Sequence, residues 1–434
     1  MERALDLGSR LGPDDATDAS LSELARGAAG SEILRIAAEI RALKATGAPV
    51  CNLTVGDFDP GLFPIPETLL AGTRAALGAG HTNYPPSDGV LALREAVARF
   101  YERELRLEYP VESVLIAGGA RPLIYGAYKT ILDPGDVALY PVPSWNNHYY
   151  THLAQARGVP IPVRAEANFF PTPDDLRPHV GEARLLLINS PLNPTGTVIS
   201  PEALAAIAGL VVEENERRRR DGRKALFLVY DQVYWQLTVE GARHVTPVGL
   251  VPEVAPWTVM LDAASKSFAA TGMRVGWGVM APAVRARMAN ILGHVGAWAP
   301  KAEQVAVAAL LDDEPALRSY RERMRAMVRE RLGLLAEGFA GLRREGFPIE
   351  TLAPQGAIYF SVRLALPGRT NDQTRRLLLD GAGLAVVPFQ AFGLTEDSGW
   401  FRLSVGAVSC DEIRALFPRL RRVLAEALAR EGAG

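Results

Sequence analysis

The chain has little cysteine, little net charge and no long apolar run. Its only cysteines, Cys51 and Cys410, are too few for a disulfide framework, which favours a reducing, cytoplasmic location. A formal net charge of −2 gives no electrostatic reason to expect nucleic acid or a membrane surface as a partner. Apolar runs such as 225–230 have the length of strands rather than of membrane spans. We expect no secretory signal, because the first residues are polar and acidic.

The hydrophobic content of 48% and the charged content of 22% are those of an ordinary globular protein. From residue 111 to residue 280, short apolar runs alternate with amphipathic segments of helix length. The runs lack strict alternation of apolar and polar residues, which indicates strands that are covered on both faces. We therefore predict an α/β fold in which helices sandwich a mostly parallel central sheet. The expected strands are 114–117, 137–140, 185–188, 226–230 and 259–261, and the expected helices include 122–131 and 201–219.

At 434 residues the chain exceeds the size at which one hydrophobic core stops growing, so we expect two domains. After residue 305 the regular alternation gives way to a long helical stretch, then short strands and a last helix, which predicts a smaller α+β domain. These elements are expected at 305–347, 357–364, 400–405 and 411–430, and a helix at 31–45 is expected to pack with them. The predicted division is a tail (1–30), a first segment of the small domain (31–56), the large domain (57–304) and the rest of the small domain (305–434).

Lys266 lies among small and apolar residues, just after the predicted strand 259–261. Open α/β sheets bind ligands at the carboxyl ends of their strands. Arg274 follows within the same loop. A lysine amine forms an imine with an aldehyde, and a guanidinium binds a phosphate through two hydrogen bonds, so the pair indicates a phosphate-bearing aldehyde cofactor. The alternative for Lys266 alone is an ordinary surface lysine.

Asp231 ends the strongly apolar run 226–230, where an unpaired carboxylate is costly. A pyridine-based cofactor needs an anion beside its ring nitrogen, and Tyr234 is placed to reach the ring's phenolic oxygen. The alternative for Asp231, a structural carboxylate that caps the following turn, stays open at this point.

Three further loops follow predicted strands. Asn193 lies between Pro191 and Pro194 in a turn that cannot continue a strand or helix, and we predict a cis Asn193–Pro194 bond. The glycine pair 118–119 precedes a predicted helix, whose free N–H groups are suited to a phosphate. Trp145 follows the next strand and is placed to stack on a flat ring, although large aromatic residues more often belong to the core.

In this order, Asn193-Pro-Thr-Gly, Asp231-x-x-Tyr234, Ser265-Lys266 with Arg274, and Phe-Arg402-Leu-Ser form a specific set. The set resembles the class I/II aminotransferases of the fold-type I pyridoxal-phosphate (PLP) enzymes, from about residue 31 to the end of the chain. The resemblance implies a fold-type I PLP-transferase architecture.

The resemblance also implies roles around the cofactor ring. Lys266 carries PLP as a Schiff base and acts as the general base on the substrate's α-proton. Asp231 pairs with the pyridinium nitrogen, while Tyr234 and Asn193 flank the phenolic oxygen. Trp145 stacks on the ring, and its Ser-Trp-x-Asn setting is most similar to that of aspartate aminotransferases.

By the same resemblance, the phosphate is bound by the backbone N–H groups of Ala120 and Arg121 and by the side chains of Ser265 and Arg274. Tyr84 matches a tyrosine that reaches the phosphate from the partner subunit, which implies a homodimer with shared active sites.

The substrate's α-carboxylate is assigned to Arg402, with Asn193 and the backbone of Gly56 beside it. Two positions depart from the family's pattern. Ala263 stands where many members have a serine, and Ala120 stands where acidic-substrate members of a bacterial subgroup have a lysine. The second departure puts aspartate specificity in doubt, unless Arg121 or another cation takes the place of that lysine.

We therefore predict a PLP-dependent aminotransferase that moves the amino group of an L-amino acid to a 2-oxo acid such as 2-oxoglutarate by a ping-pong mechanism, with no metal. The tryptophan setting favours aspartate or glutamate as the donor. A PLP-dependent carbon–sulfur β-lyase on the same fold is the main alternative. We do not expect a PLP-sensing transcription regulator, because the short acidic N-terminal tail leaves no room for a DNA-binding domain. We do not expect a dinucleotide-dependent dehydrogenase either, because the sequence has no glycine fingerprint with a properly spaced acidic residue.

Overall fold

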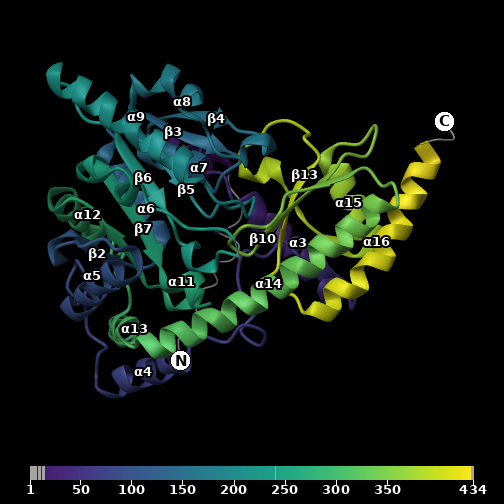
Figure 1. Cartoon of the computed structure of the whole chain (residues 1–434), viewed down its shortest axis with the longest axis horizontal. Coiled ribbons are helices and arrows are strands. Elements are labelled where there is room, and N and C mark those ends of the chain that lie inside the picture. The colour runs from purple at the N-terminus through teal and green to yellow at the C-terminus, as the bar shows by residue number, and fades with distance from the viewer. Residues whose placement is uncertain (1–6, 8–10, 12–14, 240, 432–434) are drawn as a thin grey trace.

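The computed structural model describes residues 7, 11, 15–239 and 241–431, so part of the predicted tail (1–30) lies outside the described residues. A seven-stranded sheet with the order β2-β8-β7-β6-β5-β3-β4 forms the middle of the larger part of the molecule (Figure 1). All neighbours from β7 to β4 are parallel, and β8 is antiparallel to both of its neighbours. The predicted mostly parallel sheet is therefore confirmed. The strands are β2 (Val114–Ala117), β3 (Val137–Val142), β4 (Arg157–Pro162), β5 (Ala183–Asn189), β6 (Phe227–Asp231), β7 (Thr258–Ala263) and β8 (Gly276–Val279).

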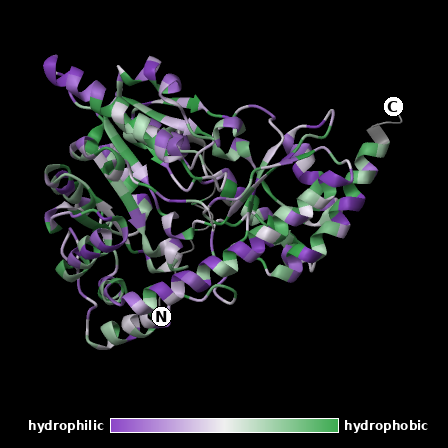
Figure 2. Cartoon of the chain, viewed as in Figure 1, coloured by the Kyte–Doolittle hydropathy of each residue, from purple (hydrophilic) through white to green (hydrophobic). Residues whose placement is uncertain are grey.

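Both faces of this sheet are buried because successive residues of each strand pack into two different cores. In β5, Leu185 and Leu187 join one core, whereas Leu186 and Ile188 join the other. The first core is closed by α6 (Ala120–Ile131), α7 (Asn147–Ala154) and α12 (Pro282–His294). Helices that close the second core include α5 (Leu91–Leu105), α8 (Pro173–Val180), α9 (Pro201–Arg220) and α13 (Lys301–Asp312). Figure 2 shows the apolar strands between helices whose outer faces are hydrophilic.

A smaller part contains a second sheet with the order β12-β13-β10-β9, all antiparallel, and a two-stranded parallel pair, β1-β11. Its strands are β1 (Cys51–Asn52), β9 (Ile349–Thr351), β10 (Tyr359–Leu364), β11 (Leu384–Ala385), β12 (Val387–Pro388) and β13 (Trp400–Ser404). Its helices are α3 (Glu32–Ala45), α14 (Glu314–Arg344), α15 (Asn371–Ala382) and α16 (Cys410–Glu431). In Figure 1 α14 runs along both parts. The predicted boundary at residue 305 falls inside α13, which packs against α4 (Glu67–Gly78) and α5, and the division into domains stays a prediction.

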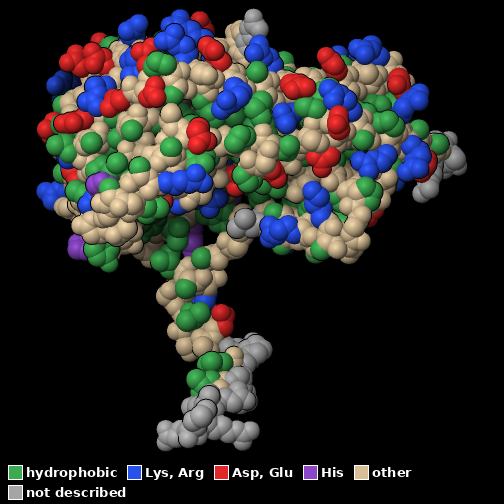
Figure 3. Space-filling view, turned by 90° about the horizontal axis from the view of Figure 1, so that it is seen from below, with side chains coloured by type: hydrophobic (Ala, Val, Ile, Leu, Met, Phe, Trp, Pro, Cys, Tyr) green, Lys and Arg blue, Asp and Glu red, His purple; other side chains and the backbone are tan. Residues whose placement is uncertain are grey.

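The segment with α1 (Asp15–Ala19) and α2 (Glu23–Arg26) stands away from the body of the molecule (Figure 3). It is attached at α7, where the Tyr149 hydroxyl donates to the Gly30 carbonyl and the His152 ring bonds the Leu24 carbonyl at 2.8 Å. None of the described helices is both long and apolar enough to cross a membrane.

The sequence did not predict several short strands. β4 contains two prolines and pairs only with β3 at the edge of the sheet, where missing N–H donors are tolerated. β8 is a four-residue strand with two glycines, which favour turns in a sequence pattern. The remaining helices and turns of the larger part are α10 (Pro247–Leu250), α11 (Ala264–Ser267), η2 (Val111–Ser113), η3 (Ala165–Ala167), η4 (Trp235–Leu237), η5 (Pro252–Trp257) and η6 (Thr271–Met273), with η7 (Phe389–Phe392) in the smaller part.

Candidate active site

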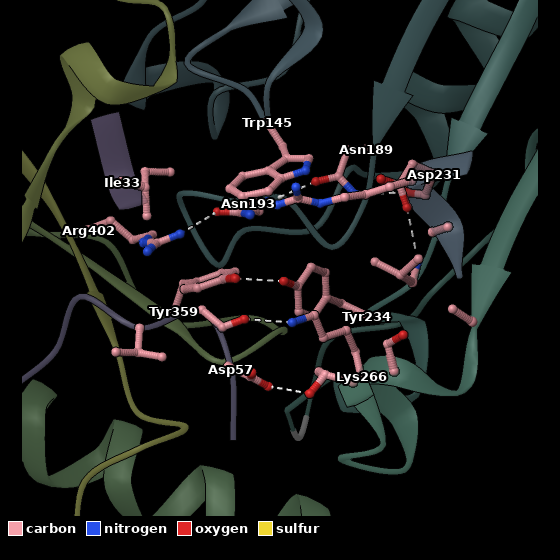
Figure 4. A pocket seen from close by; sticks show the side chains of 18 of the residues that line it. Ile33, Asp57, Trp145, Asn189, Asn193, Asp231, Tyr234, Lys266, Tyr359 and Arg402 are labelled. Atoms are coloured by element: carbon pink, nitrogen blue, oxygen red, sulfur yellow. Dashed lines mark hydrogen bonds between the residues drawn. The ribbon is translucent and has the colours of Figure 1, made fainter. Parts of the chain in front are cut away.

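A cavity of about 550 Å³ lies between the two parts, where the parallel strands end. Asn189, Asp231 and Ala263 are the last residues of β5, β6 and β7, and all three line it. The smaller part contributes Tyr359 from β10 and Arg402 from β13, which Figure 4 shows facing the strand ends. Predicted site residues that line the cavity are Gly56, Ala120, Arg121, Trp145, Asn193, Asp231, Tyr234, Ser265, Lys266, Arg274 and Arg402.

Lys266 lies in the single turn of α11, directly after β7. Its amino group donates a hydrogen bond to the Gly56 carbonyl at 2.6 Å. Burial lowers the pKa of the Lys266 amine to about 8, and the Asp57 carboxylate opposes this shift. An amine with a lowered pKa has a larger neutral fraction near neutral pH, as a nucleophile or base requires. Three guanidinium groups lower it further, those of Arg402, Arg121 and Arg274.

Asp231 is buried at the end of β6, with its carboxylate at the cavity wall. The carboxylate accepts the Val233 N–H at 3.2 Å, and the Asp231 carbonyl accepts the Asn189 amide at 2.9 Å. Burial raises the pKa of Asp231 to about 6, while the Val233 N–H and the charge of Lys266 act in the opposite direction. A buried carboxylate with so little compensation is suited to a cationic N–H group of a ligand.

Arg402 is fully buried on β13 and holds Asn193 in place. One of its terminal nitrogens donates to Asn193 Oδ1 at 3.1 Å, and the other donates to the Thr54 carbonyl at 2.6 Å. Its Nε is buried and has no partner among the described residues. The guanidinium lies 4.7 Å from the ring centre of Tyr359 and 4.9 Å from that of Phe392. The remaining N–H groups are suited to a carboxylate of a ligand.

The Asn193 loop has the rigid form that the sequence predicts. The Asn193–Pro194 bond is cis, and the Asn193 N–H donates to Asn189 Oδ1 at 2.9 Å. Gly196 has a φ of +73°, and a side chain there would collide with the Tyr359 carbonyl, so only glycine fits this close approach. Asn193 is thereby fixed between the strand ends and Arg402.

Two tyrosines meet across the cavity. The hydroxyl groups of Tyr234 and Tyr359 lie 2.6 Å apart, and burial is the main reason why both have raised pKa values. Both hydroxyls are therefore protonated at neutral pH. Because one of them donates to the other, one proton of the pair is left to donate to a ligand oxygen.

Backbone N–H groups and a guanidinium converge at the start of α6. Ala120 and Arg121 are the first residues of this helix, whose leading N–H groups have no partner within it. Gly119 precedes them with a φ of +95°, and a side chain there would collide with the Arg274 guanidinium. Arg274 itself donates to the Gly118 carbonyl at 2.8 Å. Burial, followed by the charge of Arg121, lowers the pKa of Arg274. An anion bound here would stabilise the charged form of this guanidinium and so oppose both effects.

Trp145 presents a flat face to the cavity, and the Arg121 guanidinium lies 5.1 Å from its ring centre. Tyr84 does not line this cavity. Its side chain is 80% exposed and touches Trp298 with ring centres 5.2 Å apart. Within one chain, Tyr84 is therefore not part of the site.

Sequence reasoning left several cavity residues without a role. Asp57 follows Gly56, which was singled out, and its carboxylate accepts the Thr271 hydroxyl at 2.6 Å. Tyr359 lies in no motif that would mark it among the aromatic residues, and Phe58, Trp277, Trp298 and Phe392 do not line the cavity. Ile33, Ala37 and Arg41 line it from one face of α3, four residues apart, and the helical period is the signal that could have grouped them.

The arrangement fits a flat, phosphate-bearing aldehyde cofactor. The amine for an imine, a carboxylate for a ring nitrogen, a stacking face and an anion site all border the same cavity. The orphaned Nε of Arg402 adds a place for a substrate carboxylate. Among the described residues, no cluster of His, Cys, Asp and Glu has the form of a metal site.

Comparison with known proteins gives one consistent family. The sequence profile described as Aminotransferase class I and II matches residues 48–420. A probable aspartate/prephenate aminotransferase of Thermus aquaticus is 33% identical over 381 residues, which cover 86% of this chain and 93% of that protein. An aspartate aminotransferase of Geobacillus stearothermophilus is 30% identical over 404 residues, with 91% and 96% covered. The structure of the Thermus thermophilus aspartate aminotransferase with maleate has a TM-score of 0.84 at 29% identity and covers 93% of this chain and 99% of that chain.

Proposed function

Because the chain belongs to the class I and II aminotransferases, we propose that it transfers the amino group of L-aspartate or L-glutamate to a 2-oxo acid such as 2-oxoglutarate, using PLP. The observation that carries the proposal is the position of Lys266, Asp231 and Arg402 around one cavity. Each of these groups supplies something different that amino-group transfer requires.

In this proposal Lys266 would carry PLP, and the residues that border the cavity would hold it. When bound, PLP supplies an aldehyde that forms imines with amines and a ring that accepts electrons from the substrate's α-carbon. Asp231 would pair with the protonated ring nitrogen, and Trp145 would cover one face of the ring. The N–H groups of Ala120 and Arg121 at the start of α6, with the side chains of Arg274 and Ser265, would hold the phosphate.

Tyr234 and Asn193 orient the cofactor from the side of its phenolic oxygen. Tyr234 is the donor, because its hydroxyl stays protonated at neutral pH. Asn193 is fixed by the backbone bond to Asn189 and by Arg402, so its amide has little freedom to turn away.

Arg402 binds the α-carboxylate of the substrate, with the Asn193 side chain and the Gly56 backbone beside it. A carboxylate bound there presents the α-carbon toward Lys266, whose amine holds the Gly56 carbonyl at 2.6 Å. Lys266 is placed to take the α-proton as a general base and to give it back as a general acid. Its pKa of about 8 suits both directions of this transfer near neutral pH.

The preference for an acidic donor has two supports. Relatives at 30% and 33% identity are named aspartate and probable aspartate/prephenate aminotransferases, and the Thermus thermophilus structure holds maleate, a dicarboxylate. In this chain Arg41 and Arg121 line the cavity as cations beyond those assigned to the cofactor phosphate and the α-carboxylate by Arg274 and Arg402. Either arginine can bind the side-chain carboxylate of the donor in place of the lysine that acidic-substrate members of the family have at the position of Ala120.

The functional unit in this proposal is a cytoplasmic homodimer with shared sites. The exposed Tyr84 is the residue that would enter the partner's cavity and reach the phosphate there. A dimer would cover this aromatic side chain, which contacts Trp298 among the described residues.

A donor screen tests the proposal. The purified protein with PLP is incubated with 2-oxoglutarate and each of a set of L-amino acids, and glutamate, pyruvate and ammonia are measured; glutamate as donor is tested with oxaloacetate. We expect amino transfer from the acidic donors without ammonia release. Pyruvate and ammonia from a cysteine conjugate would instead establish the β-lyase alternative, and no transfer from acidic donors would overturn the substrate assignment.

A further inference from the structure

The cavity contains a carboxylate near Lys266 that has no part in the roles described so far. Asp57 is one of two carboxylates among the described residues that line the cavity, and Asp231 is the other. Asp57 follows the short strand β1 by a few residues, so it comes from the smaller part, whereas Asp231 ends a strand of the large sheet. Figure 4 shows Asp57 and Lys266 on the same side of the cavity.

The segment that carries Asp57 is bonded to Lys266 and to the loop after it. The Lys266 amino group donates to the carbonyl of Gly56, the residue directly before Asp57, at 2.6 Å. The Asp57 carboxylate accepts the Phe58 N–H at 2.8 Å and the Thr271 hydroxyl at 2.6 Å. These bonds fix the carboxylate at the wall near the amine instead of leaving it free to turn into solvent.

The charges around Lys266 show what the Asp57 carboxylate does for the amine, because most of these charges are positive and Asp57 is negative. The half-buried amine faces three guanidinium groups, and its ring neighbours are Phe58 at 6.0 Å and Tyr234 at 5.8 Å. Asp57 is the largest charge that favours the ammonium form of Lys266. Asp231 is the second carboxylate nearby, and the charge of Lys266 partly offsets the rise that burial causes in the pKa of Asp231. In the proposed function, Asp231 is engaged by the cofactor ring, which leaves Asp57 for the amine. The three guanidinium groups that oppose the ammonium form belong to Arg402, Arg121 and Arg274.

We propose that Asp57 is a positioning residue of the proton transfer, which stabilises Lys266 in the ammonium form that it takes after accepting the substrate's α-proton. The C–H bond at the α-carbon breaks, its electron pair stays with the substrate, and an N–H bond forms on Nζ of Lys266. The amine thereby becomes an ammonium that donates to the Gly56 carbonyl and is stabilised by the charge of Asp57, and it returns to the neutral amine when it gives the proton back. The inference rests on the proposed function for the identity of the reaction, but not for the interaction of the two side chains.

The first measurement uses the full chain without cofactor. The rate at which acetic anhydride acylates Lys266 is followed by peptide mass spectrometry as a function of pH, because only the neutral amine reacts. In Asp57→Asn we expect the midpoint of this pH dependence to move to lower pH by on the order of one unit, because the negative charge that favours the ammonium form of Lys266 has been removed. Asp59→Asn is the matched control, because this exposed carboxylate two residues later only caps the Gly61 and Leu62 N–H groups. Its midpoint should equal that of the wild type.

A second variant separates charge from loop positioning. Thr271→Val removes the hydroxyl that Asp57 accepts but keeps the carboxylate, so we expect less than half of the Asp57→Asn shift. Asp57→Glu should restore part of the wild-type midpoint. In the loaded protein, Asp57→Asn should lower the plateau rate of the first half-reaction about tenfold and move its acidic limb to lower pH.

An unchanged midpoint in Asp57→Asn would overturn the inference, as would an equal shift in Thr271→Val, which would mean that Asp57 acts only by holding the loop. Circular dichroism checks the fold, and Asp57→Ser takes the place of Asp57→Asn if the latter does not fold. A failure of the proposed function would be distinguishable from a failure of this inference. If the wild type transfers no amino group while the acylation midpoint of Asp57→Asn still shifts, the proposed reaction is refuted and the interaction between Asp57 and Lys266 is retained.

Discussion

Replacing Arg402 with lysine tests how the substrate's α-carboxylate is bound. Arg402 has five N–H groups, and two of its nitrogens already donate to Asn193 Oδ1 and the Thr54 carbonyl. The rest of the guanidinium, including the orphaned Nε, can bind a carboxylate through two parallel hydrogen bonds. Lysine keeps the charge but loses the planar fork, so one charge-assisted bond is lost.

Such a bond contributes roughly 1.5–3 kcal/mol, so we expect kcat/KM for L-aspartate to fall by roughly 10- to 150-fold in Arg402→Lys. The loss should be specific to substrates that have an α-carboxylate. For β-alanine, which keeps the second carboxylate of aspartate but lacks the α-carboxylate, any residual amino transfer should change by less than about threefold, a difference of under 1 kcal/mol. Steady-state rates with 2-oxoglutarate as acceptor give both ratios.

Arg331→Lys is the matched control. Arg331 is also buried, lies 4.7 Å from the ring centre of Phe63 and donates to the Val408 carbonyl, but it does not line the cavity. Its replacement should lower the thermal midpoint and leave kcat/KM for aspartate unchanged. The reasoning would be refuted if Arg402→Lys retained wild-type kcat/KM for aspartate, or if Arg331→Lys lost as much.

Two other substitutions have defined outcomes. Burial raises the pKa of the Asp231 carboxyl from 3.8 to about 6, so this group should cost the cofactor-free fold roughly 3 kcal/mol of stability as pH rises from about 4 to 6. The buried carboxyl of Asp262 also has a raised pKa and adds a fall of its own, so the contribution of Asp231 is the difference between wild type and Asp231→Asn in urea unfolding across this pH range. Equal pH dependences in the two proteins would contradict the assignment. Gly196→Ala should destabilise the fold by about 1–3 kcal/mol, because φ is +73° and the new methyl group meets the Tyr359 carbonyl. An unaltered thermal midpoint would show that the loop can move away.

The large sheet was predictable because most of its strands are continuous apolar runs. β2, β5, β6 and β7 coincide with predicted strands to within two residues at either end, since burial on both faces leaves a clear signal. The signal fails where prolines or glycines interrupt the apolar run. β4 has two prolines, and β8 pairs through residues that include two glycines, so neither stands out from a loop.

The residues of the site also divide into those that the sequence could predict and those that it could not. Lys266, Asp231 and Arg402 lie in motifs whose order along the chain is informative, so they could be named in advance. Asp57 and Tyr359 have no such motif. Their places depend on how the segment after β1 and the strand β10 of the smaller part meet the ends of the large sheet, and that is set by tertiary packing rather than by local pattern.

The most direct test of the central claim is to identify the lysine that carries the cofactor. The protein loaded with PLP is reduced with borohydride, digested, and searched by mass spectrometry for the peptide that carries the cofactor. We predict modification at Lys266 in the wild type, and neither modification at this position nor turnover in Lys266→Ala. Lys301 donates to Asn83 outside the cavity, so the control variant Lys301→Ala should behave as the wild type. Modification of another lysine, or transamination by Lys266→Ala at the wild-type rate, would contradict it.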